Sequence, residues 1–184
     1  TNFRVIVESG VCPTDTSTLA TITILPKPSA DFVSDTVCLG QPINFANMTS
    51  IPPGYLVLYI WDFGDGQSST NAQPTHTYAA AGNYTVQLIA MSNFGCLDTI
   101  QYNAGVNPSP DATIGSSGPL TFCSGGSVDL FVPFITFNTY LWSTTATTNL
   151  ISVNTTGTYG ITVTDINTGC ISTNSVDVTV FNIP

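Results

Sequence analysis

Five cysteines and one histidine carry most of the side-chain chemistry open to this 184-residue sequence. Cysteines in proteins bind zinc or form disulfides, and a structural zinc site needs four thiolate or imidazole ligands, often with a Cys-x-x-Cys pair. The sequence has no Cys-x-x-Cys motif, and only His76 could be added to the thiols. We therefore expect disulfides, which form in oxidising compartments and indicate a protein outside the cell.

The cysteines occupy matching places in an internal repeat. Cys38 and Cys123 lie near the start of two similar segments, and we call them early cysteines, whereas Cys12, Cys96 and Cys170 lie near segment ends and are called late cysteines. Pairing one early with one late cysteine inside each segment predicts the disulfides Cys38–Cys96 and Cys123–Cys170. Cys12 is then a late cysteine whose partner lies upstream of this sequence.

Strands must position these cysteines, because the composition gives little support to helices. Lys and Arg together number 2, Thr, Val, Ile, Tyr and Phe are abundant, and no apolar pattern with a period of 3.6 is present. Proline pairs at 26–28 and 108–110 fit short extended linkers. The sequence predicts an all-β protein of tandem β-sandwiches with negligible helix, divided into a partial domain at 1–26 and further domains at 27–108 and 109–184.

The charge and hydropathy of the chain exclude two classes of partner. The formal net charge is −9, and a nucleic-acid groove or an anionic-membrane anchor needs clustered Lys and Arg. No stretch approaches the roughly 20 consecutive apolar residues of a spanning helix. We expect no nucleic-acid partner and no direct membrane insertion.

Catalysis finds little support in the sequence. His76 is the only conventional general base near neutral pH, no Gly-x-Ser-x-Gly nucleophile motif is present, and Lys27 lies in a proline linker. We predict no enzyme activity and no catalytic residue.

One group of motifs resembles a known family. Residues 61–66 read Trp-Asp-Phe-Gly-Asp-Gly, followed by Pro74-Thr-His76-Thr-Tyr78 and then Gly82-Asn-Tyr84. This combination closely resembles the polycystic-kidney-disease (PKD) domain, and it implies a PKD domain at 27–108. The segment 109–184 lacks the hexapeptide and resembles Ig-like modules found beside PKD domains in Bacteroidota surface proteins, including gliding-motility adhesins exported by type IX secretion. Residues 1–26 are then the last strands of a truncated Ig-like domain.

The family motif is expected to be structural. The residues with this role are Trp61, Asp62, Gly64, Asp65, Gly66, His76 and Tyr84. Tyr84 would cap the turn before its strand through its hydroxyl group. Some PKD modules bind calcium, so the resemblance also leaves Asp31, Asp62 and Asp65 as weak calcium candidates, and no other cofactor is expected.

Two further threonines fit a modification pattern of the resembled bacterial group. Thr36 and Thr99 each follow an aspartate and precede an aliphatic residue, as in the Asp-Ser/Thr-aliphatic motif for O-glycosylation. The same tripeptides also fit simple transitions from a turn into a strand.

The resulting functional hypothesis is a non-catalytic, extracellular array of structural or adhesive modules at the cell surface. Its expected partners are neighbouring modules of the same long chain and surface polysaccharide or protein. The alternative is an accessory binding or spacer module of a secreted hydrolase, and a sugar-stacking platform of converging aromatic rings would favour it. Candidate rings are Tyr55, Tyr102, Phe134 and Phe137. A third hypothesis is polymerisation by exchange of a strand, involving residues 1–26.

Overall fold

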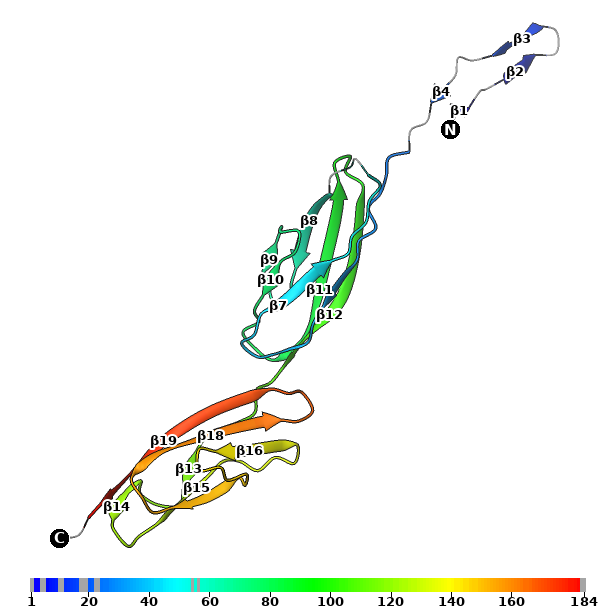
Figure 1. Cartoon of the computed structure of the whole chain (residues 1–184). Helices are drawn as coiled ribbons and strands as arrows, with labels where there is room; N and C mark the ends of the chain where they lie inside the picture. Colours follow the sequence, from blue (N-terminus) through cyan, green and yellow to red (C-terminus); the bar gives the residue numbers. More distant parts are fainter. Residues whose placement is uncertain are drawn as a thin grey trace. The chain divides into compact units, whose positions relative to one another are not determined.

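The computed structural model describes residues 24–53, 55 and 57–182, together with the backbone of four short strands before them (Figure 1). These four are β1 (Asn2–Phe3), β2 (Ile6–Ser9), β3 (Cys12–Thr16) and β4 (Ala20–Thr21). β1 pairs with β4 and β2 pairs with β3, both antiparallel. The predictions of a truncated domain at 1–26 and of an upstream partner for Cys12 concern side chains and segments outside the described residues.

The first β-sandwich is built from two sheets. Its strands are β5 (Phe32–Ser34), β6 (Val37–Cys38), β7 (Ile43–Asn47), β8 (Val57–Asp62), β9 (Ser68–Ser69), β10 (Thr75–His76), β11 (Gly82–Ser92) and β12 (Leu97–Asn107). One sheet has the order β10-β7-β5, and the other has the order β6-β12-β11-β8-β9. In β7 and β11 apolar side chains alternate between buried and more exposed positions, as strands with one face on a core require.

Aromatic rings fill the space between these two sheets. Phe32 of β5 and Phe45 of β7 both pack on Trp61 of β8, with ring centroids 5.1 and 5.8 Å apart, and all three side chains are fully buried. The Phe32–Trp61 pair is edge-to-face, a geometry that adds roughly 0.5–1.5 kcal/mol to the burial of the rings. The core therefore joins residues that lie about 30 positions apart in the sequence.

The second β-sandwich has its own two sheets and its own core. Its strands are β13 (Gly115–Ser116), β14 (Thr121–Cys123), β15 (Val128–Phe131), β16 (Asn138–Trp142), β17 (Leu150–Val153), β18 (Gly157–Asp165) and β19 (Ile171–Phe181). The sheet orders are β13-β15-β17 and β14-β19-β18-β16. Leu130, Trp142 and Val163 are among the buried side chains of one continuous hydrophobic cluster.

None of the described residues lies in a helix, so the prediction of an all-β fold is confirmed. In the same part of the chain, no helix is long and apolar enough to cross a bilayer.

In each sandwich a short strand pairs in parallel with the end of an 11-residue strand. Cys38 of β6 lies opposite Asn107, the last residue of β12. Cys123 of β14 lies opposite Phe181, the last residue of β19. The two early cysteines therefore have the same place in their sheets.

Candidate functional site

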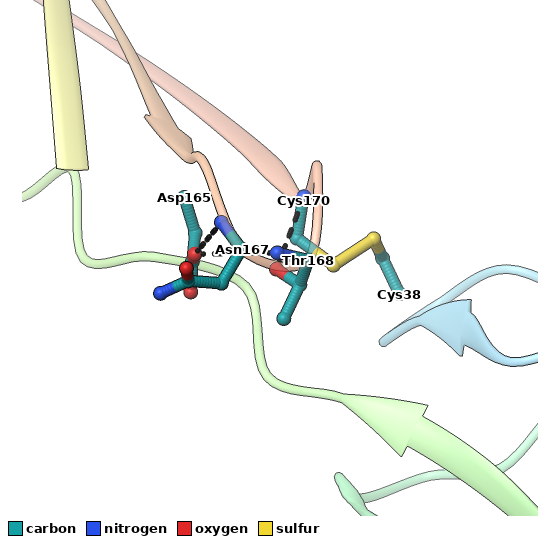
Figure 2. Close-up of a disulfide and its surroundings, with 5 residues drawn as sticks. All are labelled: Cys38, Asp165, Asn167, Thr168 and Cys170. Atoms are coloured by element: carbon teal, nitrogen blue, oxygen red, sulfur yellow. Dashed lines mark hydrogen bonds between the residues drawn. A yellow bond between two sulfur atoms is a disulfide. The ribbon is translucent and has the colours of Figure 1, made fainter. Parts of the chain in front are cut away.

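The structure contains a disulfide between Cys38 and Cys170, whose Cα atoms lie 5.6 Å apart (Figure 2). The bond joins β6 of the first sandwich to the turn between β18 and β19 of the second. Cys96 and Cys123 are free cysteines. The predicted pairs Cys38–Cys96 and Cys123–Cys170 are therefore wrong.

Strand length explains why Cys38 does not pair with Cys96. Cys38 lies opposite the last residue of β12, whereas Cys96 immediately precedes its first residue, Leu97. At about 3.3 Å per residue, an 11-residue strand separates the two cysteines by roughly 35 Å. A disulfide needs Cα atoms within about 7 Å, so this pair cannot form in the folded sandwich.

The second sandwich repeats this separation. Cys123 lies opposite Phe181 at the end of β19, and Cys170 immediately precedes the first residue of that strand. The strand again has 11 residues. The sequence repeat suggested pairing inside each segment. The number of strand residues between the late cysteine and the segment end argues against that pairing.

The late cysteines are presented by similar turns. The backbone N–H of Asp165 donates to the carbonyl of Cys170 at 2.9 Å. The Asp165 carboxylate accepts from the N–H of Asn167 at 2.8 Å (Figure 2). In the first sandwich, the N–H of Ser92 donates to the carbonyl of Cys96 at 2.9 Å, and its hydroxyl accepts from the N–H of Cys96 at 3.2 Å. A polar side chain inside the turn thus holds each late cysteine at the start of its long strand.

The early cysteines are also presented alike. The N–H of Gln41 donates to the carbonyl of Cys38 at 3.0 Å, and the N–H of Gly126 donates to the carbonyl of Cys123 at 3.3 Å. Both turns contain a glycine with positive φ, +87° at Gly40 and +95° at Gly125. A residue with a Cβ rarely adopts this conformation, so glycine is needed at this position of each turn.

The hexapeptide at 61–66 forms a strand end and a tight turn. Asp62 and Asp65 accept hydrogen bonds through their carboxylates from the backbone N–H groups of Gly64 and Gln67, at 2.9 and 3.0 Å. Gly64 and Gly66 both have positive φ. Trp61 is fully buried, and its indole N–H donates to the carbonyl of Asn71 at 2.9 Å. These contacts give the motif residues a structural role in this sandwich.

The remaining motif residues form one aromatic stack. His76 is buried with its ring edge against Tyr78, at 4.5 Å between centroids, and Tyr78 stacks on Tyr84 at 3.8 Å. The Tyr84 hydroxyl donates to the carbonyl of Ala80 at 2.8 Å, which is the turn-capping bond expected from the sequence. Tyr159 makes the equivalent bond to Thr155 at 3.0 Å in the second sandwich.

The three aspartates considered for calcium each serve a local hydrogen bond. Asp31 accepts from the N–H of Phe32 at 2.9 Å and from the hydroxyl of Tyr102 at 3.2 Å. The negative charge of Asp31 and this hydrogen bond raise the pKa of Tyr102 above its ordinary value. Within the described part of the chain, no three His, Cys, Asp or Glu side chains gather in a metal-binding arrangement.

Asp98 anchors the start of the first sandwich to β12. Its carboxylate lies 2.6 Å from the ammonium of Lys27 and accepts a hydrogen bond from the N–H of Ala30 at 2.8 Å. The Lys27 hydrogen bond, followed by that of Ala30, lowers the pKa of Asp98. Thr36 and Thr99, the residues of the O-glycosylation pattern, are both exposed.

The four aromatic side chains of the proposed sugar platform are divided between the sandwiches, with Tyr55 and Tyr102 in the first and Phe134 and Phe137 in the second. Tyr55 packs on Phe94 and Tyr102 packs on Phe32, both in the first sandwich. Phe134 belongs to the second, where it is 71% exposed and borders a cavity of about 500 Å³. Asn138 and Thr148 also line this cavity, and the side-chain nitrogen of Asn138 is buried without a hydrogen-bond partner among the described residues.

Comparison with known families matches residues 26–106 to the model of the PKD domain. This segment is a PKD domain. The match contains the tryptophan hexapeptide, the aromatic stack around His76 and both cysteines of the first sandwich. A PKD domain is a non-catalytic module.

Relatives of the PKD domain occur in larger proteins. The pre-pro-metalloprotease PrtV of Vibrio cholerae is 41% identical over 68 residues, which are 37% of this chain and 7% of PrtV. Collagenase ColA of Bacillus cereus is 31% identical over 109 residues, which are 59% of this chain and 11% of the collagenase. The chain thus matches only a small share of each relative's length.

A solved structure of a PKD domain is similar to part of the chain. The first PKD domain of Epp from Vibrio anguillarum is 34% identical, with a TM-score of 0.42, and the match covers 45% of this chain and 95% of that domain.

Proposed function

We propose that this chain is a non-catalytic, extracellular structural segment in which consecutive β-sandwich modules are joined covalently. The observation that carries the proposal is the disulfide Cys38–Cys170, which adds a second covalent connection between two sandwiches already joined through Pro108 and Pro110. Two connections leave fewer relative arrangements than a single linker does, so the joint resists bending and separation. A disulfide also fits a location outside the cell.

The segment fits an adhesin or surface filament made of many such modules, with neighbouring modules of the same long chain as its main partners. In this proposal the second sandwich is an Ig-like module like those beside PKD domains in Bacteroidota surface proteins, including gliding adhesins exported by type IX secretion. Each module extends the chain and withstands extracellular conditions, since the sequence has few charged residues and one disulfide links the two modules. Surface polysaccharide or protein would be bound elsewhere along the array.

The alternative proposal is an accessory spacer or binding module of a secreted hydrolase. It is supported by the relatives, which are named as a metalloprotease and collagenases and are much longer than the matched segment. The mass and domain content of the protein isolated from its source separate the two proposals. A chain many times 19.4 kDa with repeated modules supports the array, whereas one catalytic domain carrying one or two modules supports the appendage.

A test of the structural role compares the oxidised chain with the double variant Cys38→Ser/Cys170→Ser by small-angle X-ray scattering. The bridged chain should show a narrower distribution of intramolecular distances, and the double variant a broader one. Cys123→Ser is the matched control, because it removes an exposed thiol and leaves the bridge intact. Identical profiles for the bridged chain and the double variant would contradict a bracing role.

A second candidate function, carbohydrate binding, has one specific observation in its favour. The cavity beside Phe134 combines an exposed ring with lining by the polar residues Asn138 and Thr148, as a site that stacks and hydrogen-bonds a sugar requires. Affinity electrophoresis in soluble polysaccharides tests it. Phe134→Ala should abolish any retardation, whereas Ile166→Ala, which removes another exposed apolar side chain of the same sandwich, should not.

A further inference from the structure

We propose that Cys123 and Cys96 each form a disulfide with a cysteine of a neighbouring module, of the same kind as the Cys38–Cys170 disulfide. The partner of Cys123 is the late cysteine of a following module of this kind. The partner of Cys96 is the early cysteine of a preceding module. The proposal rests on the geometry of the cysteines and not on the proposed structural function.

The first step compares the two early cysteines. Cys38, which is bridged, and Cys123, which is free, each end a short strand that pairs in parallel with the last residues of an 11-residue strand. The residue after each cysteine donates its N–H to that last residue, Leu39 to Asn107 at 2.9 Å and Ser124 to Phe181 at 2.8 Å. Cys123 is thus held in the position from which Cys38 forms its bridge, and its side chain is exposed.

The second step compares the two late cysteines. Cys170, which is bridged, and Cys96, which is free, each follow a glycine with positive φ and immediately precede an 11-residue strand. In both turns the carbonyl of the cysteine accepts a hydrogen bond from the residue that opens the turn, Asp165 or Ser92. Cys96 is half-buried, so it has the backbone setting of Cys170 without the partner.

The third step follows from the strand between them. Each sandwich carries one cysteine at either end of its long strand, and the roughly 35 Å between them prevents pairing inside a module. The bridge that does form runs from the early cysteine of one module to the late cysteine of the next along the chain. Applied to the remaining thiols, this rule makes the joint directional, so that an early cysteine pairs with a late one and never with another early one.

The bond forms by ordinary oxidation of two thiols. Each joint loses two protons and two electrons to a small-molecule disulfide, which is reduced to two thiols as the new sulfur–sulfur bond forms. Oxidised glutathione provides this chemistry in the test below.

The registers of the two sandwiches specify the chain to make. Phe181 lies opposite Cys123 as Asn107 lies opposite Cys38, so Pro184 corresponds in sequence to Pro110. Residues 111–184 added directly after Pro184 therefore place a further late cysteine at the same chain length from Phe181 as Cys170 is from Asn107. The longer chain is oxidised with glutathione, its free thiols are alkylated, and its disulfides are mapped by mass spectrometry after digestion with pepsin.

The expected result is a disulfide between Cys123 and the added copy of Cys170, together with Cys38–Cys170. Tethering gives the added cysteine an effective concentration of about 1 mM, so alkylation of Cys123 should fall roughly tenfold relative to the original chain. Cys96 is the internal control, because the added segment supplies no preceding early cysteine and Cys96 should stay reactive. Changing the added cysteine to serine should restore alkylation of Cys123.

Two results would overturn the proposal. One is full alkylation of Cys123 in a longer chain that contains the Cys38–Cys170 bridge. The other is pairing of the added cysteine with an early cysteine of its own module.

A mixing experiment with the original chain keeps the proposal open to refutation if the longer chain does not fold. In a Cys12→Ser background, Cys96→Ser leaves only the early thiol free, and Cys123→Ser leaves only the late one. Oxidised together, the two variants should form a mixed dimer, and each alone should remain largely monomeric. Dimers of each single variant in equal yield, or no mixed dimer, would contradict a directional joint.

Discussion

Cys38 and Cys170 are 132 residues apart in the sequence, yet a disulfide holds their Cα atoms 5.6 Å apart. The bond connects β6 directly to the turn between β18 and β19, and the strands β7 to β18 lie between the two cysteines in the sequence. Cys38 lies opposite Asn107, the last residue of β12, from which the chain continues to the linker at Pro108. The connection between the sandwiches is thereby double.

The first prediction concerns the stability that this bridge provides. Closing a loop of this length restricts the unfolded chain, and the chain-entropy model gives roughly 4–5 kcal/mol. Cys38→Ser/Cys170→Ser should therefore unfold at a clearly lower urea concentration than the oxidised chain, and reduction of the original chain should have the same effect. Cys123→Ser should leave the midpoint unchanged. Equal midpoints for the bridged and unbridged chains would show that the bridge contributes nothing to stability.

The second prediction uses one tryptophan in each sandwich. Trp61 and Trp142 are both buried, and their indole N–H groups donate to the carbonyls of Asn71 and Thr148, each at 2.9 Å. Replacing either with phenylalanine removes this bond and some packing, at a cost of about 1–3 kcal/mol.

In Trp61→Phe, the fluorescence of Trp142 reports on the unaltered sandwich during urea unfolding. Its transition should stay in place while circular dichroism records earlier loss of the other sandwich. Trp142→Phe provides the reciprocal experiment. A shared shift of both signals would mean that the two sandwiches unfold as one cooperative unit.

The third prediction concerns the tyrosine hydroxyls that cap a turn. Tyr84→Phe removes the hydrogen bond to Ala80, and Tyr159→Phe removes the equivalent bond to Thr155. Tyr84→Phe should lower the free energy of unfolding by about 0.5–1.5 kcal/mol, because one net hydrogen bond is lost. Tyr159→Phe should cost at least as much, because the Tyr159 hydroxyl also shares a hydrogen bond with the Thr155 hydroxyl at 2.9 Å. Tyr59→Phe is the control, since no hydrogen bond of its hydroxyl is seen within the described residues. An equal loss in Tyr59→Phe would argue against the capping role.

The fourth prediction is a pH dependence. The Lys27 hydrogen bond and the N–H of Ala30 lower the pKa of Asp98 in the folded state below its ordinary value of 3.8. A lowered folded-state pKa means that the unfolded chain takes up the proton first, so the contribution of Asp98 to stability is present above about pH 4 and is lost on further acidification.

Asp98→Asn should therefore be less stable than the original chain at neutral pH, with the difference shrinking as the pH falls from 4 to 2. Urea midpoints measured across this range test the expectation. Asp35→Asn, at an exposed carboxylate without a recorded partner in the described region, is the matched control. A difference that grows towards low pH would refute the assigned role of Asp98.

The sequence by itself determined the fold class, the family of the first sandwich and the equivalence of the cysteines. Alternating apolar residues such as Ile43 and Phe45 predict a strand with one buried face wherever that strand packs, and the hexapeptide with His76 and Tyr84 is specific enough to identify a PKD domain. The structural roles of Trp61 and Tyr84 followed from the same local patterns, because a strand end and its turn involve residues close in sequence.

Only the tertiary structure decided how the cysteines pair. The repeat marked Cys38, Cys96, Cys123 and Cys170 as two equivalent pairs, and pairing inside each repeat was the simplest interpretation. The outcome depended on the parallel register that places Cys38 beside Asn107 and on the length of β12, which carries Cys96 to the opposite end of the sheet. Such a register is a contact between residues about 70 positions apart, set by packing of the whole sandwich, and no local pattern of residues encodes it.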